Sequence, residues 1–127
     1  MNPDEIKVKG ENPRIILHNF SSSDDMLVGG KIEYIPDGDC LMAQVDRGGK
    51  VVSLTPVWPQ GFESVQENNK RGVADTDSGT FLEGDNVQAS GTFLDADDEA
   101  MAEVGIDSPC RSSRGFVVFN KGSFTNG

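Results

Sequence analysis

The sequence predicts a mainly β protein, a small antiparallel barrel that is closed or nearly closed, with one short helix before the last strand. Short segments alternate apolar and polar residues at a period of two, which is typical of half-buried strands. Fifteen glycines and six prolines among 127 residues indicate many tight turns between those segments. Closing the sheet into a barrel would also remove the free strand edges that favour aggregation.

The first 24 residues differ from the rest and are predicted to form an arm or tether. They are charged, interrupted by prolines and end in small polar residues, a composition typical of linkers. Within this arm, residues 15–20 (IILHNF) could add one short strand. The barrel domain is expected to span residues 25–122, and residues 123–127 to form a tail.

Three strands joined by two tight turns are predicted next, over residues 26–35, 40–46 and 50–58. A PDGD turn joins the first two strands and an RGG turn joins the second to the third, because Pro fixes φ and Gly allows a positive φ. Together the three strands predict an antiparallel meander. The residues predicted to face the core are Met26, Val28, Ile32, Tyr34, Leu41, Ala43, Val45, Val52 and Leu54.

The segment after the meander is predicted to be a polar loop over residues 60–80, since Gln, Asn, Lys, Asp and Gly predominate there. A hairpin is predicted over residues 79–94, turning at residues 83–86, with Val87, Ala89 and Phe93 on one face. In that hairpin Gly91 is expected either to let a neighbouring backbone approach closely or to bend the strand.

The helix is predicted over residues 95–105. Asp95 can cap it, acidic residues fill its first turn, where the helix dipole favours them, and Gly105 can end it. A last strand over residues 115–120 would close the barrel. The result would be OB-like in size, although the helix comes later than in the usual OB order.

The charge of the chain argues against nucleic acid as a partner. The net charge is −10, from 21 acidic and 11 basic residues, and phosphate backbones repel such a surface. We interpret the acidity as a source of solubility. No apolar run reaches the roughly 18 residues that a membrane helix requires, so no membrane span is expected.

The two cysteines, Cys40 and Cys110, each lie beside a turn at the start of a predicted strand. A disulfide between them would stabilise the domain by roughly 4 kcal/mol, because it closes a long loop in the unfolded chain. The alternative is two unrelated buried thiols in a cytosolic protein. Two cysteines and one distant histidine do not match a metal-site pattern, so neither a metal nor a cofactor is expected.

Three segments resemble small all-β domains of uncharacterised actinobacterial exported proteins and lipoproteins: GDCLMAQVDRGGKVVSLTPVWPQGF, FLEGDNVQASGTFL and DSPCR with GFVVFN. The matching positions are Gly38, Cys40, Leu41, Trp58, Pro59, Gly61, Gly84, Asp85, Val87, Pro109 and Cys110. The resemblance implies an extracytoplasmic domain with a Cys40–Cys110 disulfide, and it implies no reaction. The lipid-attachment cysteine and leader of a lipoprotein are missing, so any lipid tether would belong to a precursor. The Gly-Gly usual after the Gly-Asp-x-Val strand is here only Ser-Gly.

The residue types that support catalysis are sparse. A hydrolase or transferase needs a nucleophile, a base and an orienting group, and the single histidine, His18, is expected on the surface of the arm. No carboxylate pair has the apolar setting that would raise one pKa. We therefore expect that the protein is not an enzyme.

Calcium binding is also not expected. Asp75 and Asp77 begin a stretch that is similar to a calcium-binding loop and are the weak candidates for ligands. However, Thr80 and Asn86 occupy the positions at which such a loop has Gly and Glu.

The single tryptophan, Trp58, could be a platform for a ligand or a plug that closes the barrel. Pro56 and Pro59 remove two backbone donors and favour extended neighbours, which predicts a sheet edge or rim. Trp58 shares the parity of the inward Leu54, so we predict a plug, packed beside Phe62. A rim aromatic beside a polar loop is nevertheless where small barrels meet partners. The candidate partner contacts are Trp58, Phe62, Glu63 and Arg71.

These observations together predict a non-enzymatic, extracytoplasmic binding or interaction module whose partner is a protein or a cell-surface component. The alternative is a structural component of an assembly, such as a virion decoration or surface-layer protein. A polar arm and a compact acidic body suit either role. The sequence does not predict the oligomeric state.

Overall fold

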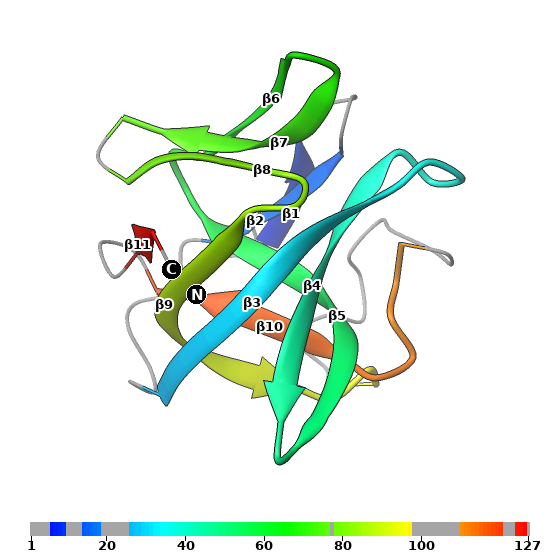
Figure 1. The fold of residues 1–127 in the computed structure, drawn as a ribbon. Helices are drawn as coiled ribbons and strands as arrows, with labels where there is room; N and C mark the ends of the chain where they lie inside the picture. The colour runs from blue at the N-terminus through cyan, green and yellow to red at the C-terminus, as the bar shows by residue number, and fades with distance from the viewer. Residues whose placement is uncertain are drawn as a thin grey trace.

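The computed structural model describes residues 6–9, 14–18, 26–76, 78–97, 110–120 and 124–126. Figure 1 shows a β-barrel with a smaller sheet over one end. The strands are β1 (Ile6–Lys9), β2 (Ile15–His18), β3 (Met26–Ile35), β4 (Cys40–Arg47), β5 (Lys50–Pro59), β6 (Glu63–Glu67), β7 (Lys70–Asp75), β8 (Gly79–Leu82), β9 (Asn86–Leu94), β10 (Phe116–Phe119) and β11 (Thr125–Asn126).

The barrel is closed by five strands in the order β5, β10, β9, β3 and β4, with β4 returning to β5. The predicted closed β-barrel is therefore confirmed, but the prediction that it is antiparallel is wrong. β10 runs parallel to β5, with Phe116 opposite Thr55 and Val118 opposite Val57. β5 and β10 lie far apart in the sequence, so no hairpin turn fixes their relative direction, and the barrel is mixed.

The predicted meander is confirmed. β3 pairs antiparallel with β4, and β4 pairs antiparallel with β5. The two-residue turn at Gly48 and Gly49, both at positive φ, joins β4 to β5. The residues of these strands that were predicted to face inward and that are fully buried in the main core are Val28, Ile32, Leu41, Ala43, Val45 and Leu54.

The prediction of a polar loop over residues 60–80 is wrong, because this segment forms the three-stranded sheet β6–β7–β8. The turn between β6 and β7 has Asn68 at φ 51° and Asn69 at φ 66°, as the type I′ turn of a tight hairpin requires. Two buried side chains, Val73 and Phe81, join the main core from this sheet. Apart from Gly72, the other residues of the sheet are exposed or half-buried, which is why its composition resembles that of a loop.

The predicted hairpin over residues 79–94 is also wrong. β8 pairs with β7, whereas β9 pairs with β3 and β10, so the turn at residues 83–85 carries the chain from the small sheet into the barrel. The expected close approach at Gly91 is confirmed. A Cβ atom there would overlap the carbonyl oxygen of Val118 on β10, so only glycine fits at this crossing.

The predicted strand within the N-terminal segment is confirmed as β2. It runs parallel to β5, with Ile16 opposite Val57, and each of its four residues is buried. β1 pairs antiparallel with β2 on its other side. This part of the segment therefore packs with the barrel.

The predicted helix is not found among the described residues. Residues 95–97, at its predicted start, leave β9 in a turn. The remainder, residues 98–105, lies outside the described residues.

β10 is buried on both faces and thereby separates two apolar clusters. Val117 and Phe119 point into the main core inside the barrel. Phe116 and Val118 pack on the outer face with the two cysteines and Ile16. A strand that is buried on both faces consists of consecutive apolar residues, as the sequence FVVF of β10 does.

Candidate functional site

Trp58 is a buried plug, as predicted. Its side chain is 1% exposed, and its ring lies 5.5 Å from that of Phe62 and 5.1 Å from that of Phe119. Phe124 stacks on it at 5.9 Å. These rings fill the end of the barrel that the small sheet covers, where Phe81 also contacts Phe124. The indole Nε1 has no hydrogen-bond partner among the described residues.

Pro56 lies inside a strand that has partners on both sides, so the predicted sheet edge is wrong for it, whereas Pro59 is the last residue of β5, at the end of the barrel that Trp58 fills. Thr55 N donates to Gly115 O on the β10 side. Because successive N–H groups of a strand point to opposite sides, the N–H that Pro56 lacks would point away from β10. On that side β4 pairs as far as Leu54 and β2 begins pairing at Val57. Pro56 thus occupies the gap between two partner strands, where no ladder bond is lost.

The four candidate partner contacts are not brought together as one surface. Trp58 and Phe62 are each 1% exposed, which leaves them no surface for a partner. Glu63 is exposed at the start of β6. Arg71 is half-buried with its guanidinium 4.5 Å above the ring of Tyr34. The prediction that a partner binds at this end therefore has only Glu63 and part of Arg71 to support it.

Tyr34, beneath Arg71, is held by a second contact. Its hydroxyl donates a 2.6 Å hydrogen bond to Asp39 Oδ1, and this bond raises the pKa of Tyr34 above its ordinary value. Asp39 itself lies in the turn between β3 and β4 at φ 55°. The contacts of Tyr34 and Arg71 thus tie the small sheet to that turn.

His18 is buried, so the expectation of a surface histidine is wrong. It is 3% exposed, and its Nε2 donates a 2.6 Å hydrogen bond to the carbonyl oxygen of Phe119. Burial lowers the pKa of His18, more than the backbone hydrogen bond raises it. The neutral imidazole of His18 therefore has a structural role: its hydrogen bond to this carbonyl joins β2 to the end of β10.

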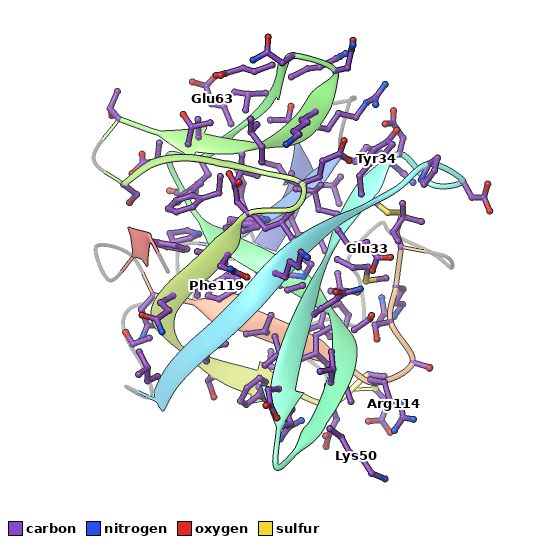
Figure 2. The ribbon with its side chains drawn as sticks, in the orientation of Figure 1. Glu33, Tyr34, Lys50, Glu63, Arg114 and Phe119 are labelled. Atoms are coloured by element: carbon purple, nitrogen blue, oxygen red, sulfur yellow. A yellow bond between two sulfur atoms is a disulfide. The ribbon has the colours of Figure 1, made fainter. Side chains whose placement is uncertain are left out.

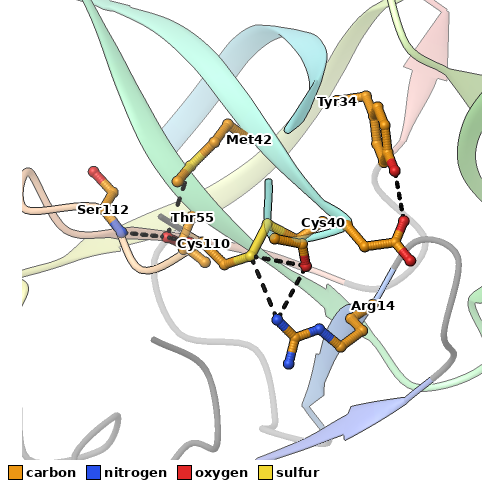
Figure 3. Close-up of a disulfide and its surroundings, with 9 residues drawn as sticks. Arg14, Tyr34, Cys40, Met42, Thr55, Cys110 and Ser112 are labelled. Atoms are coloured by element: carbon orange, nitrogen blue, oxygen red, sulfur yellow. Dashed lines mark hydrogen bonds between the residues drawn. A yellow bond between two sulfur atoms is a disulfide. The ribbon is translucent and has the colours of Figure 1, made fainter. Parts of the chain in front are cut away.

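The predicted disulfide between Cys40 and Cys110 is present, with the two Cα atoms 6.0 Å apart (Figure 3). It ties the start of β4 to the segment before β10. Beside it, Arg14 Nη2 donates to Gly38 O at 3.0 Å. Thr55 Oγ1 donates to Cys110 O at 2.7 Å and accepts from Ser112 N at 2.8 Å. These bonds hold Gly38 on one side of the disulfide and the segment from Cys110 to Ser112 on the other.

The weak calcium candidates are placed only in part. Asp75 ends β7 and is half-buried, with its Oδ1 close to Gly61. Asp77 lies outside the described residues. The expectation that the protein has no specific calcium site stays a prediction.

The residues that the structure describes leave the opposite end of the barrel open. A hollow of about 570 Å³ lies there, and Figure 2 shows Lys50 and Arg114 at this end and Glu63 at the far one. Its apolar wall consists of Val28 and Val45, which are buried, and of Val52 and Phe93, which are half-buried. Among the described residues, no ring other than that of Phe93 lines the mouth. The remaining lining residues are Leu27, Gly29, Asp46, Arg47, Gly48, Lys50 and Arg114.

Three cationic side chains line this hollow. Arg47 and Lys50 are directly opposite each other across the β4–β5 hairpin, and Arg114 precedes β10. The guanidinium of Arg47 lies 4.1 Å from the centre of the Phe93 ring, a cation–π contact. Asp46, the acidic lining residue, accepts a 3.0 Å hydrogen bond from Gly49 N and so closes the hairpin turn.

Sequence reasoning missed this site, although signals for it exist. The inward parity of Val45 and Val52 continues to Arg47 and Lys50, so the charged pair points toward the barrel mouth. Phe93 has the same inward parity on β9. No local sequence pattern indicated that Arg114 belongs to the site, because only the closure of the barrel brings it to this end.

The comparisons with known proteins add no function: no family model, no curated protein and no solved structure matches this chain. No helix long and apolar enough to cross a membrane occurs in the part of the chain that the structure describes.

Proposed function

We propose that the protein is a non-enzymatic, extracytoplasmic binding module whose binding site is the open end of the barrel. The observation that carries the proposal is the contrast between the two barrel ends. One end is filled by Trp58 and its aromatic neighbours, and the other holds a hollow of about 570 Å³. That volume lies within the range of small-molecule sites, roughly 300–1,000 Å³.

The chemistry of the lining supports binding rather than catalysis. Its side chains are aliphatic, aromatic and cationic, apart from Asp46, whose carboxylate is engaged by the hairpin backbone. The buried histidine lies elsewhere, bonded to Phe119. The lining can therefore hold and orient a ligand but presents no base next to a nucleophile.

The extracytoplasmic part of the proposal rests on the disulfide. Disulfides persist in oxidising compartments and are rare where glutathione keeps thiols reduced. Non-reducing peptide mapping of protein from its native compartment should recover Cys40 and Cys110 as one linked peptide. Two freely alkylated thiols in that preparation would contradict this assignment.

The binding site is tested by titrating the oxidised, ¹⁵N-labelled full chain with three fragments of different charge: indole, benzamidine and 4-phenylbutyrate. At least one should shift backbone amides of residues 27–29, 45–52 and 93 selectively, and it should be recovered chemically unchanged. If none of the three shifts these amides at millimolar concentration, or if the shifts fall at the small sheet instead, the proposal is wrong.

The alternative role, a structural component of an assembly, makes a different prediction. The large hydrophobic side chains that are exposed in the described ranges are Leu27 (73%) and Val51 (69%). Two such side chains contribute little of the roughly 1,200 Å² that a stable interface buries. We therefore expect a monomer in sedimentation experiments at micromolar concentration. Self-association that is lost in the variant L27S/V51S would favour the assembly role instead.

A further inference from the structure

We infer that the hollow at the open end of the barrel binds an organic oxyanion, a ligand with an apolar body and a carboxylate, sulfonate or phosphate group. This inference rests on the proposed function and adds the chemical class of the ligand. Charge, strand pairing and the shape of the lining each support it.

The charge of the rim is opposite to that of the chain. The protein carries a net charge of −10 and has only 11 basic residues, yet Arg47, Lys50 and Arg114 all line one hollow. A positive rim on an acidic protein attracts a small anion into the mouth. A long polyanion such as nucleic acid would extend over the acidic remainder and be repelled.

The strand pairing at the rim brings two like charges together. Arg47 and Lys50 face each other directly in the β4–β5 ladder, and like charges in that position destabilise a hairpin. Local features that oppose stability are expected where a site serves function. An oxyanion between the two cations would replace their repulsion with two attractive contacts.

The apolar wall of the hollow indicates that the rest of the ligand is apolar. Val45 and Val52 pair directly across the hairpin, one step deeper than the charged pair. Phe93 contributes a half-buried ring beside them. Because the guanidinium of Arg47 stacks on that ring, its N–H donors are held next to an apolar surface. A ligand with its apolar end against the valines would place its charged end among the cations.

The test compares three probes in NMR titrations of the oxidised full chain: 4-phenylbutyrate, its neutral analogue 4-phenylbutanamide, and butyrate. We expect 4-phenylbutyrate to shift the amides of residues 27–29, 45–52 and 93. The amide should bind at least tenfold more weakly because it lacks the charge, and butyrate at least tenfold more weakly because it lacks the ring.

A pair of variants with equal net charge tests the role of the rim. K50Q/R114Q should weaken 4-phenylbutyrate binding about fivefold to tenfold, from two exposed ion pairs. The matched control is K31Q/K70Q, in which both lysines are exposed and lie on β3 and β7 outside the hollow. Lys70 also matches Lys50 in position, since each is the first residue after a two-residue turn. The control should change binding less than twofold.

The inference is overturned if 4-phenylbutanamide binds as tightly as 4-phenylbutyrate, or if both double variants weaken binding equally. Those results would leave a binding site at the hollow and remove only its preference for anions. If neither the fragments of the first titration nor these probes shift the amides around the hollow, the proposed function fails with the inference.

Discussion

Replacing Trp58 with alanine tests the reasoning about the core most directly. The side chain is 1% exposed and packs against three phenylalanine rings. Removing a buried tryptophan costs about 3–5 kcal/mol, a large share of the roughly 5–15 kcal/mol that stabilises a typical domain. We therefore expect Trp58→Ala to be at most marginally folded at 25 °C.

Trp58→Phe separates packing from polarity at the same position. The indole Nε1 is buried with no hydrogen-bond partner in the described part of the chain, and such an unpaired donor costs about 1–3 kcal/mol. Phenylalanine keeps an aromatic ring in the cluster and removes that donor, so the gain offsets much of the lost packing. We expect this variant to lie within about 1.5 kcal/mol of the wild type.

Urea unfolding followed by far-UV circular dichroism measures both variants, since neither retains the fluorophore. Leu27→Ala, at a side chain that is 73% exposed, is the control and should change stability by less than about 0.5 kcal/mol. In the wild type, tryptophan emission should be blue-shifted and resist acrylamide. The reasoning is refuted if Trp58→Ala unfolds at the wild-type urea concentration, or if Trp58→Phe is as unstable as Trp58→Ala.

Three further predictions concern the disulfide, the buried histidine and one glycine. Reducing the Cys40–Cys110 bond, which spans a separation of 70 residues, should lower the free energy of unfolding by about 4 kcal/mol; equal urea midpoints with and without reductant would contradict this. Burial lowers the pKa of His18 in the folded state, so the unfolded chain takes up that proton first, and stability should fall as pH drops below about 6.5. His18→Gln should flatten the slope between pH 5 and 7, and an unchanged slope would show that other groups cause it. Gly91→Ala should cost at least about 1–3 kcal/mol, because its Cβ would overlap a carbonyl of the neighbouring strand, whereas Gly29→Ala, which has room for a Cβ, should be nearly neutral in the same assay.

Much of the barrel could be predicted from local sequence signals. The meander β3–β4–β5 follows from period-two alternation and from turns rich in Gly and Pro, because both signals depend only on neighbouring residues. The inward position of Trp58 followed from its parity with Leu54. For the two cysteines beside strand starts the sequence left a disulfide and two separate thiols as alternatives, and the structure has the disulfide.

The polar sheet β6–β7–β8 was missed for a physical reason. A strand is recognised by the apolar face that it buries, and this sheet adds only Val73 and Phe81 to the main core. The Asn68–Asn69 turn was the one local signal, since asparagine tolerates the positive φ that a tight hairpin needs.

The sequence by itself determined which residues of this protein form strands in the meander, which of their side chains face inward and where the tight turns lie. These properties depend on residues close together in the chain. Only the tertiary structure decided that β10 runs parallel to β5, that His18 is buried, and that Arg114 joins Arg47 and Lys50 at one barrel mouth. Each of these depends on contacts between segments far apart in the chain, whose partner and direction no local pattern of residues specifies.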